Sequence, residues 1–189
     1  MTTPKLRAVG GLDRDLQQSL LNQVRDLWNH TSTALEGNTL TLGETKFVIE
    51  EGLTVSGKPL KDHQEVMGHA WAIALIYAGL DGPITESRLF DLHRAVQSEI
   101  VTDIYKPYGA WKLEPNGTYA VTEDGRQPFV EYASPGDVPP LMTEWLAELN
   151  PLAVESLSET DAVEAYARLH LRFVHMSPFW EATGAWPAC

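Results

Sequence analysis

Residues Phe173–Cys189 read FVHMSPFWEATGAWPAC, and this stretch decides the assignment of the fold. It follows the segment AYARLHLRFVHM, which closes a helix predicted to begin at Glu159-Thr160-Asp161 and to run to about Met176. The reactive residue types elsewhere in the chain say little when they are taken one at a time. The pattern of this C-terminal stretch therefore carries the functional argument.

Helices are also predicted for most of the chain before residue 101. An apolar stripe at spacings of three and four predicts a helix from about residue 12 to 30, and it consists of Leu12, Leu16, Leu20, Val24, Leu27 and Trp28. Three more helices are predicted from the positions of glycine and proline: a short one ended by Gly52, a long apolar-rich one from Pro59 to Gly79, and one from about Thr85 to Ile100.

The segment from about residue 105 to 136 has a different composition, rich in glycine and proline. It predicts a β-hairpin with strands at Thr118–Val121 and Pro128–Tyr132 and turns at Asn116-Gly117 and Asp124-Gly125. Pro139-Pro140 then begins another helix. The predicted fold class is mainly α: a helical bundle with one β-hairpin, in a single domain spanning residues 1–189.

Composition narrows the function classes. The formal net charge is −12, which disfavours binding to nucleic acid or to an anionic membrane surface. No apolar run is long enough to span a membrane, and the N-terminal residues lack the apolar core of a signal peptide, so we expect a cytoplasmic protein. The histidines on predicted helices have no second ligand four residues on and are expected to be ordinary surface or core residues; they are His63, His69, His93 and His170.

The C-terminal stretch resembles the signature of the Fic (Fido) family, H-P-F-x-[D/E]-G-N-G-R, which follows a helix. LEGNTLTLGET and VPPLMTEWLAELN are also similar to segments of such proteins. The resemblance implies AMP transfer from ATP to a hydroxyl side chain of a target protein. It also implies that the signature histidine is the general base, that the acidic residue holds Mg²⁺, and that the glycines and asparagine cradle phosphate.

Residues 177–185 match the family signature at only some of its positions. Pro178, Phe179 and Gly184 fit the signature, and Glu181 stands at the metal-binding position. Ser177 replaces the catalytic histidine. The phosphate-binding segment is degenerate because Ala182, Thr183 and Ala185 replace Gly, Asn and Arg. Loss of a general base typically costs a factor of about 10²–10⁴ in rate, so the resemblance implies an inactive or strongly impaired enzyme.

A second motif lies near the N-terminus. Ser32-Thr-Ala-Leu-Glu36-Gly37-Asn38 is similar to the family's inhibitory motif [S/T]-x-x-x-E-[G/N], which predicts an inhibitory helix at about residues 30–38. The resemblance implies that Glu36 pairs with the signature arginine and blocks ATP. Here that position is Ala185, so a Glu36 packed inward would be a buried carboxylate without a counter-charge. The alternative interpretation is a helix C-terminus ended by Gly37 and Asn38.

The end of the chain suggests a genetic hypothesis. Degenerate codons for Glu181–Cys189, read from the third base of the Glu181 codon, permit Gly-Asn-Gly-Arg. A frameshift just upstream of Ala182 would then account for the tail, and we expect the C-terminal helix or helices of the family to be missing. Coding DNA whose alternative frame lacks these four codons would contradict the hypothesis.

Three functional readings stay open from the sequence. The first is an impaired AMP-transferase that needs ATP and Mg²⁺ and holds a target protein through a flap at about residues 108–134 by main-chain pairing. The second is a non-catalytic pseudoenzyme that uses the flap and a groove to bind a nucleotide or a protein. The third is a purely structural helical domain whose likeness to the signature is accidental.

Overall fold

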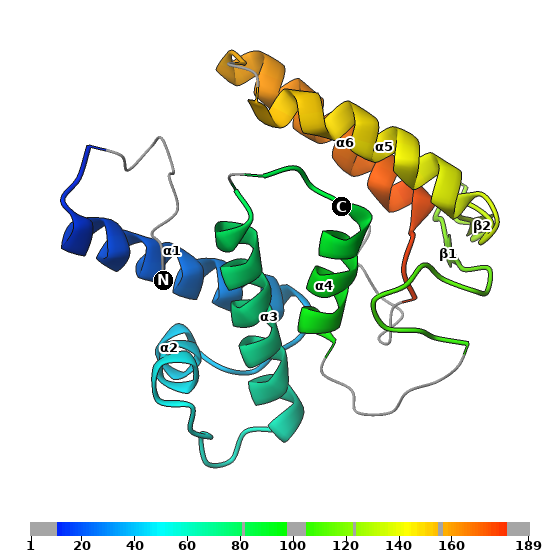
Figure 1. Cartoon of the computed structure of the whole chain (residues 1–189). Coiled ribbons are helices and arrows are strands. Elements are labelled where there is room, and N and C mark those ends of the chain that lie inside the picture. The colour runs from blue at the N-terminus through cyan, green and yellow to red at the C-terminus, as the bar shows by residue number, and fades with distance from the viewer. Residues whose placement is uncertain (1–10, 81, 98–104, 123, 155–156, 181–189) are drawn as a thin grey trace. The chain divides into compact units, whose positions relative to one another are not determined.

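The computed structural model describes residues 11–80, 82–97, 105–122, 124–154 and 157–180. These described residues are mainly helical and include one small antiparallel sheet (Figure 1). The chain divides into two compact units. Among the described residues, unit 1 contains 11–80, 82 and 91–97, and unit 2 contains 83–90, 105–122, 124–154 and 157–180.

Unit 1 is built on α1 (Arg14–Leu35), α2 (Leu42–Glu51) and α3 (Leu60–Ala78), and α1 packs against both of the others. The first helix continues five residues beyond its predicted end at residue 30. Threonine hydroxyls in this extension donate back to main-chain carbonyls one turn earlier, Thr31 to Leu27 at 2.9 Å and Thr33 to Asn29 at 3.0 Å. The predicted ends of the next two helices are confirmed, since Gly52 and Gly79 are their C-caps.

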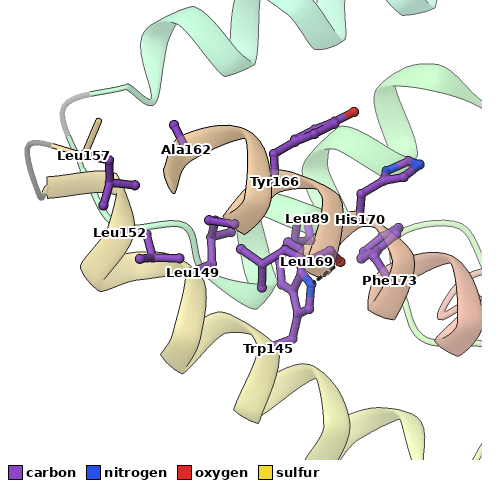
Figure 2. A pocket seen from close by; sticks show the side chains of 11 residues that line it. Leu89, Trp145, Leu149, Leu152, Leu157, Ala162, Tyr166, Leu169, His170 and Phe173 are labelled. Carbon is purple, nitrogen blue, oxygen red and sulfur yellow. Dashed lines mark hydrogen bonds between the residues drawn. The ribbon is translucent and has the colours of Figure 1, made fainter. Parts of the chain in front are cut away.

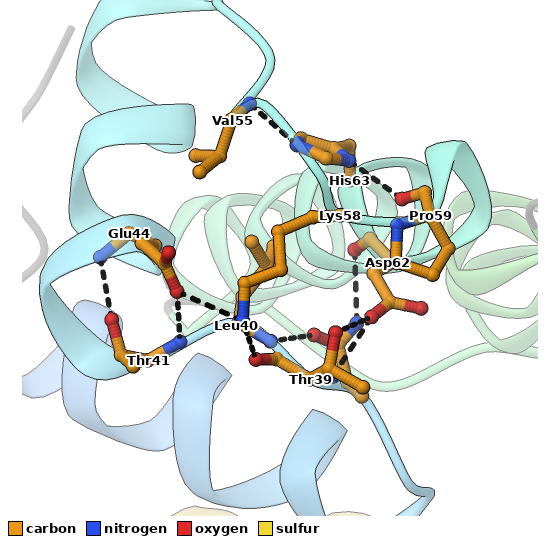
Figure 3. A network of polar contacts seen from close by, with 10 residues as sticks. Thr39, Leu40, Thr41, Glu44, Val55, Lys58, Pro59, Asp62 and His63 are labelled. Carbon is orange, nitrogen blue, oxygen red and sulfur yellow. Dashed lines mark hydrogen bonds and ion pairs between the residues drawn. The ribbon is translucent and has the colours of Figure 1, made fainter.

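A polar network joins the loop before α2 to the first turn of α3 (Figure 3). Asp62 accepts hydrogen bonds from both the main-chain N–H and the hydroxyl of Thr39, at 2.8 and 2.5 Å. His63 accepts from the Val55 N–H at Nε2 and approaches the Pro59 carbonyl with Nδ1 at 2.7 Å, which requires the neutral imidazole with its proton on Nδ1. His63 is therefore used as a structural bridge.

Gly68 of α3 lies against the main chain of the second half of α4 (Glu86–Val96), and the contact leaves no room for a side chain at this position. A Cβ atom at this position would lie 2.5 Å from the Ala95 carbonyl oxygen. The glycine is therefore needed for close approach of two backbones, not for an unusual dihedral angle.

Unit 2 contains the antiparallel hairpin of β1 (Gly117–Tyr119) and β2 (Phe129–Glu131), in which Thr118 pairs with Val130. The predicted turn at Asp124-Gly125 is confirmed, because Gly125 has φ +77° and donates to the Thr122 carbonyl at 2.8 Å. The turn predicted at Asn116-Gly117 is wrong. Gly117 is instead the first residue of β1. A glycine is needed there because a Cβ atom would collide with the Val130 carbonyl oxygen and the Phe129 ring.

The helices α5 (Val138–Val154) and α6 (Glu159–Met176) lie side by side as a hairpin (Figure 1). Their predicted starts are confirmed: Pro139 and Pro140 occupy the first turn of α5, and Ser158 caps α6 just before Glu159. At the end of α6 near the hairpin, the core consists of Val138, Met142 and Met176, with Leu89, Trp111, Ala133, Leu141, Trp145 and Phe173 packed around them.

The largest fully buried side chain in the described parts of the molecule is a lysine, Lys112, which is 1% exposed. Burial lowers the pKa of Lys112 to about 8, and the charge of Glu131 opposes this shift. Its ammonium donates to Asn116 Oδ1 at 2.5 Å and to the Met176 carbonyl at 3.2 Å. Protein acceptors thus replace the water that a lysine normally keeps.

No helix among the residues described combines the length and the apolar character that crossing a lipid bilayer requires.

The close approach at Gly68 predicts the effect of a single added methyl group. Gly68→Ala is expected to lower the free energy of unfolding by about 1–3 kcal/mol, because the backbones must separate. Gly43→Ala is the matched control, since Gly43 lies in α2 with open space around its Cβ position. It is expected to be neutral or stabilising by up to about 1 kcal/mol. Urea denaturation measures both, and equal stability of the two variants would contradict the packing argument.

The buried lysine predicts a pH dependence of stability. Between its folded pKa of about 8 and the ordinary value of 10.5, Lys112 is protonated in the unfolded chain but neutral in the folded one. The unfolded state binds more protons in this window, so this residue's contribution to stability rises with pH. The destabilisation caused by Lys112→Met is expected to be larger at pH 9.5 than at pH 7, by on the order of 1 kcal/mol. Lys46→Met, on an exposed lysine, should show no such difference in urea titrations.

Candidate functional site

Position 177, where the signature histidine would stand, is the C-cap of α6. Ser177 has φ 40° and ψ 66°, and it is the one non-glycine residue with positive φ in the described parts of the chain. Its N–H donates to the carbonyls of Phe173 and Val174, which closes the last turn of the helix. A residue held in this sparsely populated conformation points to a site that the surroundings fix firmly.

The Ser177 hydroxyl is connected to the flap, residues 108–134. Asn116 Nδ2 donates to Ser177 Oγ at 3.0 Å, and the Asn116 side chain accepts from Lys112 at its oxygen. A serine hydroxyl is not a proton acceptor near neutral pH, and this one already accepts a hydrogen bond. The side chain at position 177 is therefore held in a fixed orientation, but a serine hydroxyl is a much weaker base than an imidazole.

The main chain on both sides of position 177 is held by the flap. The Lys112 N–H donates to the Pro178 carbonyl at 2.9 Å, and the Ala133 N–H donates to the His175 carbonyl at 3.4 Å. His175 itself is exposed at the side-chain level. The strand-bearing segment and the end of α6 thus form one hydrogen-bonded unit.

The Pro-Phe pair of the signature is part of an aromatic cluster. Pro178 is fully buried. The Phe179 ring lies 5.2 Å from Trp111, and Phe90 contacts the same tryptophan edge-on at 4.6 Å between ring centroids. These contacts hold the segment after α6 against the flap.

The predicted metal and phosphate positions lie outside the described residues. This applies to Glu181, Ala182, Thr183, Gly184 and Ala185, so their roles stay predictions. Among the residues that the structure does describe, no group of three or more His, Cys, Asp and Glu side chains is arranged to hold a metal ion.

The predicted inhibitory segment lies in unit 1, at the end of α1. Ser32 is half-buried in the last turn, Glu36 is the exposed C-cap, and Gly37 has φ +89°. Partial burial and, to a smaller extent, the charge of Glu65 raise the pKa of Glu36. The alternative interpretation, a helix C-terminus ended by Gly37 and Asn38, describes this local geometry.

Asn38 contributes to the fold of unit 1. Its Nδ2 donates to the Asp62 carbonyl at 2.9 Å and to Glu65 Oε2 at 3.0 Å, and its Oδ1 accepts from the Leu40 N–H. These bonds connect the residues after α1 to α3. An inhibitory role for Ser32, Glu36, Gly37 and Asn38 stays a prediction.

Unit 2 also contains an apolar cavity of about 450 Å³ (Figure 2). It lies against α5 and α6, and two of its lining residues are joined by a hydrogen bond, in which Trp145 Nε1 donates to the Leu169 carbonyl at 2.9 Å. The lining is almost entirely apolar: Leu89, Trp145, Leu149, Leu152, Leu157, Ala162, Ala165, Tyr166, Leu169, His170 and Phe173. Such a lining does not suit a phosphate group.

Sequence reasoning missed Lys112 and Asn116. The Asn116-Gly117 dipeptide predicts a local turn, whereas the Asn116 side chain bonds to Ser177, 61 positions away. The sequence gives only a weak indication that Lys112 is buried, namely its position between Trp111 and Leu113 in an otherwise apolar stretch.

Comparison with solved structures places this fold among Fic domains. A Fic domain containing signaling protein from Bacteroides thetaiotaomicron superposes with a TM-score of 0.75 at 29% identity, covering 94% of this chain and 64% of that one. Fic-1 from C. elegans gives a TM-score of 0.62 at 24% identity, covering 88% of this chain and 46% of that one, which supports the fold alone.

Sequence comparison agrees. Proteins named protein adenylyltransferase Fic from Drosophila erecta and Drosophila virilis are 30% and 31% identical over 155 residues, which is 81% of this chain. The chain spans less than a third of their length, 28% and 29%. The Fic/DOC family model matches residues 83–185, more than half of the 189 residues. The chain belongs to the Fic/DOC family.

Proposed function

We propose that this chain is a protein adenylyltransferase domain whose capacity for AMP transfer is strongly impaired at position 177. The observation that carries the proposal is that Ser177 occupies a fixed position at the end of α6, held by the flap, where the family signature has its histidine. The relatives named as adenylyltransferases support the reaction class.

The described residues hold position 177 in place, but the side chain there is a serine hydroxyl, which is too weak a base to replace the signature histidine. The flap fixes residues 175–178 through main-chain bonds, and the aromatic cluster keeps Pro178 and Phe179 in place. When bound, ATP with Mg²⁺ would supply the AMP group and its charge neutralisation. The residues proposed to hold them are Glu181 for the metal and 182–185 for phosphate, all of which lie outside the described part of the chain.

A second candidate function is peptide binding by the flap. The hairpin has only two strands among the described residues, and its apolar side chains Tyr119, Phe129 and Val130 are exposed. An extended peptide can add to such an edge by main-chain pairing. This function needs neither ATP nor a general base, so it would survive the changes in the signature.

Restoring the signature tests the proposal. The repaired chain carries Ser177→His, Ala182→Gly, Thr183→Asn and Ala185→Arg, with and without Glu36→Gly. Incubated with Mg²⁺, α-labelled ATP and a cell lysate, it is expected to label protein at least about 10²-fold faster than the original chain, because the imidazole accepts the hydroxyl proton. γ-Labelled ATP should give no label, which distinguishes AMP transfer from phosphoryl transfer.

The matched control restores residues 182–185 but keeps Ser177, and we expect it to stay near the activity of the original chain. Equal labelling by the original and repaired chains would contradict impairment at position 177. A silent repaired chain, together with peptide binding by the original chain, would favour the second function. Faster labelling with Glu36→Gly than without it would support the inhibitory assignment.

A further inference from the structure

We propose that Lys112 is a positioning residue: it ties the base of the flap to both sides of residue 177 and thereby fixes the direction in which the side chain at this position projects. The inference rests on the proposed function only for the importance of position 177. The contacts themselves require no nucleotide and no transfer reaction.

Lys112 holds the chain immediately before and after Ser177. Its Nζ donates to the carbonyl of Met176 at 3.2 Å, and its main-chain N–H donates to the carbonyl of Pro178 at 2.9 Å. One residue of the flap thus contacts positions 176 and 178 together. With both neighbouring peptide groups held, the residue between them has little freedom to rotate.

The second connection runs through Asn116 to the side chain at position 177. Lys112 Nζ donates to Asn116 Oδ1 at 2.5 Å, and Asn116 Nδ2 donates to Ser177 Oγ at 3.0 Å. The Asn116 carbonyl accepts from the Tyr132 N–H at 3.0 Å, directly after β2. Asn116 is therefore the point where both arms of the hairpin meet the end of α6.

The acceptors around Lys112 offset part of the cost of burying its ammonium group. Met176 is the last residue of α6, so its carbonyl belongs to the helix end that lacks intrahelical donors and carries partial negative charge. A buried ammonium is tolerated only when protein acceptors replace its water, and Lys112 finds them in Met176 and Asn116. Glu131 adds a favourable charge interaction from β2.

A purely structural lysine would fill the core without affecting the hydroxyl at position 177. The hydrogen-bond chain instead predicts coupling between Lys112 and Ser177 through the Asn116 amide. The side-chain N–H resonances of Asn116 report this coupling directly, because Asn116 contacts both residues.

The test is amide hydrogen exchange and ¹⁵N NMR on the full chain at pH 7, without ATP. Lys112→Met is expected to accelerate exchange at least tenfold at the main-chain amides of residues 112, 132 and 177. The amide of Thr45 in unit 1 should be unchanged. Lys112→Arg, which keeps the charge, is expected to recover most of the protection, and Lys46→Met on an exposed lysine is the control.

The side-chain resonances of Asn116 are expected to shift in both Lys112→Met and Ser177→Ala, with non-additive shifts in the double variant. Normal protection of residues 132 and 177 in folded Lys112→Met would overturn the inference, as would additive shifts. If Lys112→Met does not fold, Asn116→Leu takes its place in the experiment. This variant keeps the lysine and removes only the Asn116 amide that joins it to Ser177. Unchanged protection at residues 132 and 177 in Asn116→Leu then overturns the inference. A silent repaired enzyme would count against the proposed function and leave these results unaffected.

Discussion

The ammonium group of Lys112 is removed from water, and this constraint organises unit 2 around the end of α6. A desolvated cation needs protein oxygens at hydrogen-bond distance, and here they come from the helix terminus and from Asn116. Satisfying one charge therefore places the flap, the last turn of α6 and position 177 together. Phe179 packs against Trp111 in the same region, with 5.2 Å between the ring centroids.

Unit 1 uses the same principle with a carboxylate. Asp62, 7% exposed, accepts two hydrogen bonds from Thr39, and the Thr39 carbonyl accepts from Lys58 at 2.5 Å. This arrangement holds the segment after Glu36 against α3. The geometry of the predicted inhibitory segment is thus set by contacts within its own unit.

The sequence predicts helix ends better than strand contacts, for physical reasons. Gly52, Gly79 and Pro139 act through their own backbone, so their positions indicate boundaries without knowledge of the fold. The error at Gly117 shows the limit, because that glycine is required by the Val130 carbonyl and the Phe129 ring across the hairpin. The burial of Lys112 depends on contacts 64 residues away, and local pattern does not contain them.

The signature pattern identified the family and located position 177, yet it did not indicate the backbone conformation there. The left-handed geometry of Ser177 restricts which residues the site accepts. Glycine, asparagine, aspartate and histidine adopt this region more readily than others, and β-branched residues are disfavoured. A histidine introduced at this position would therefore meet a backbone conformation that it tolerates, whereas valine, isoleucine and threonine would meet a conformational barrier.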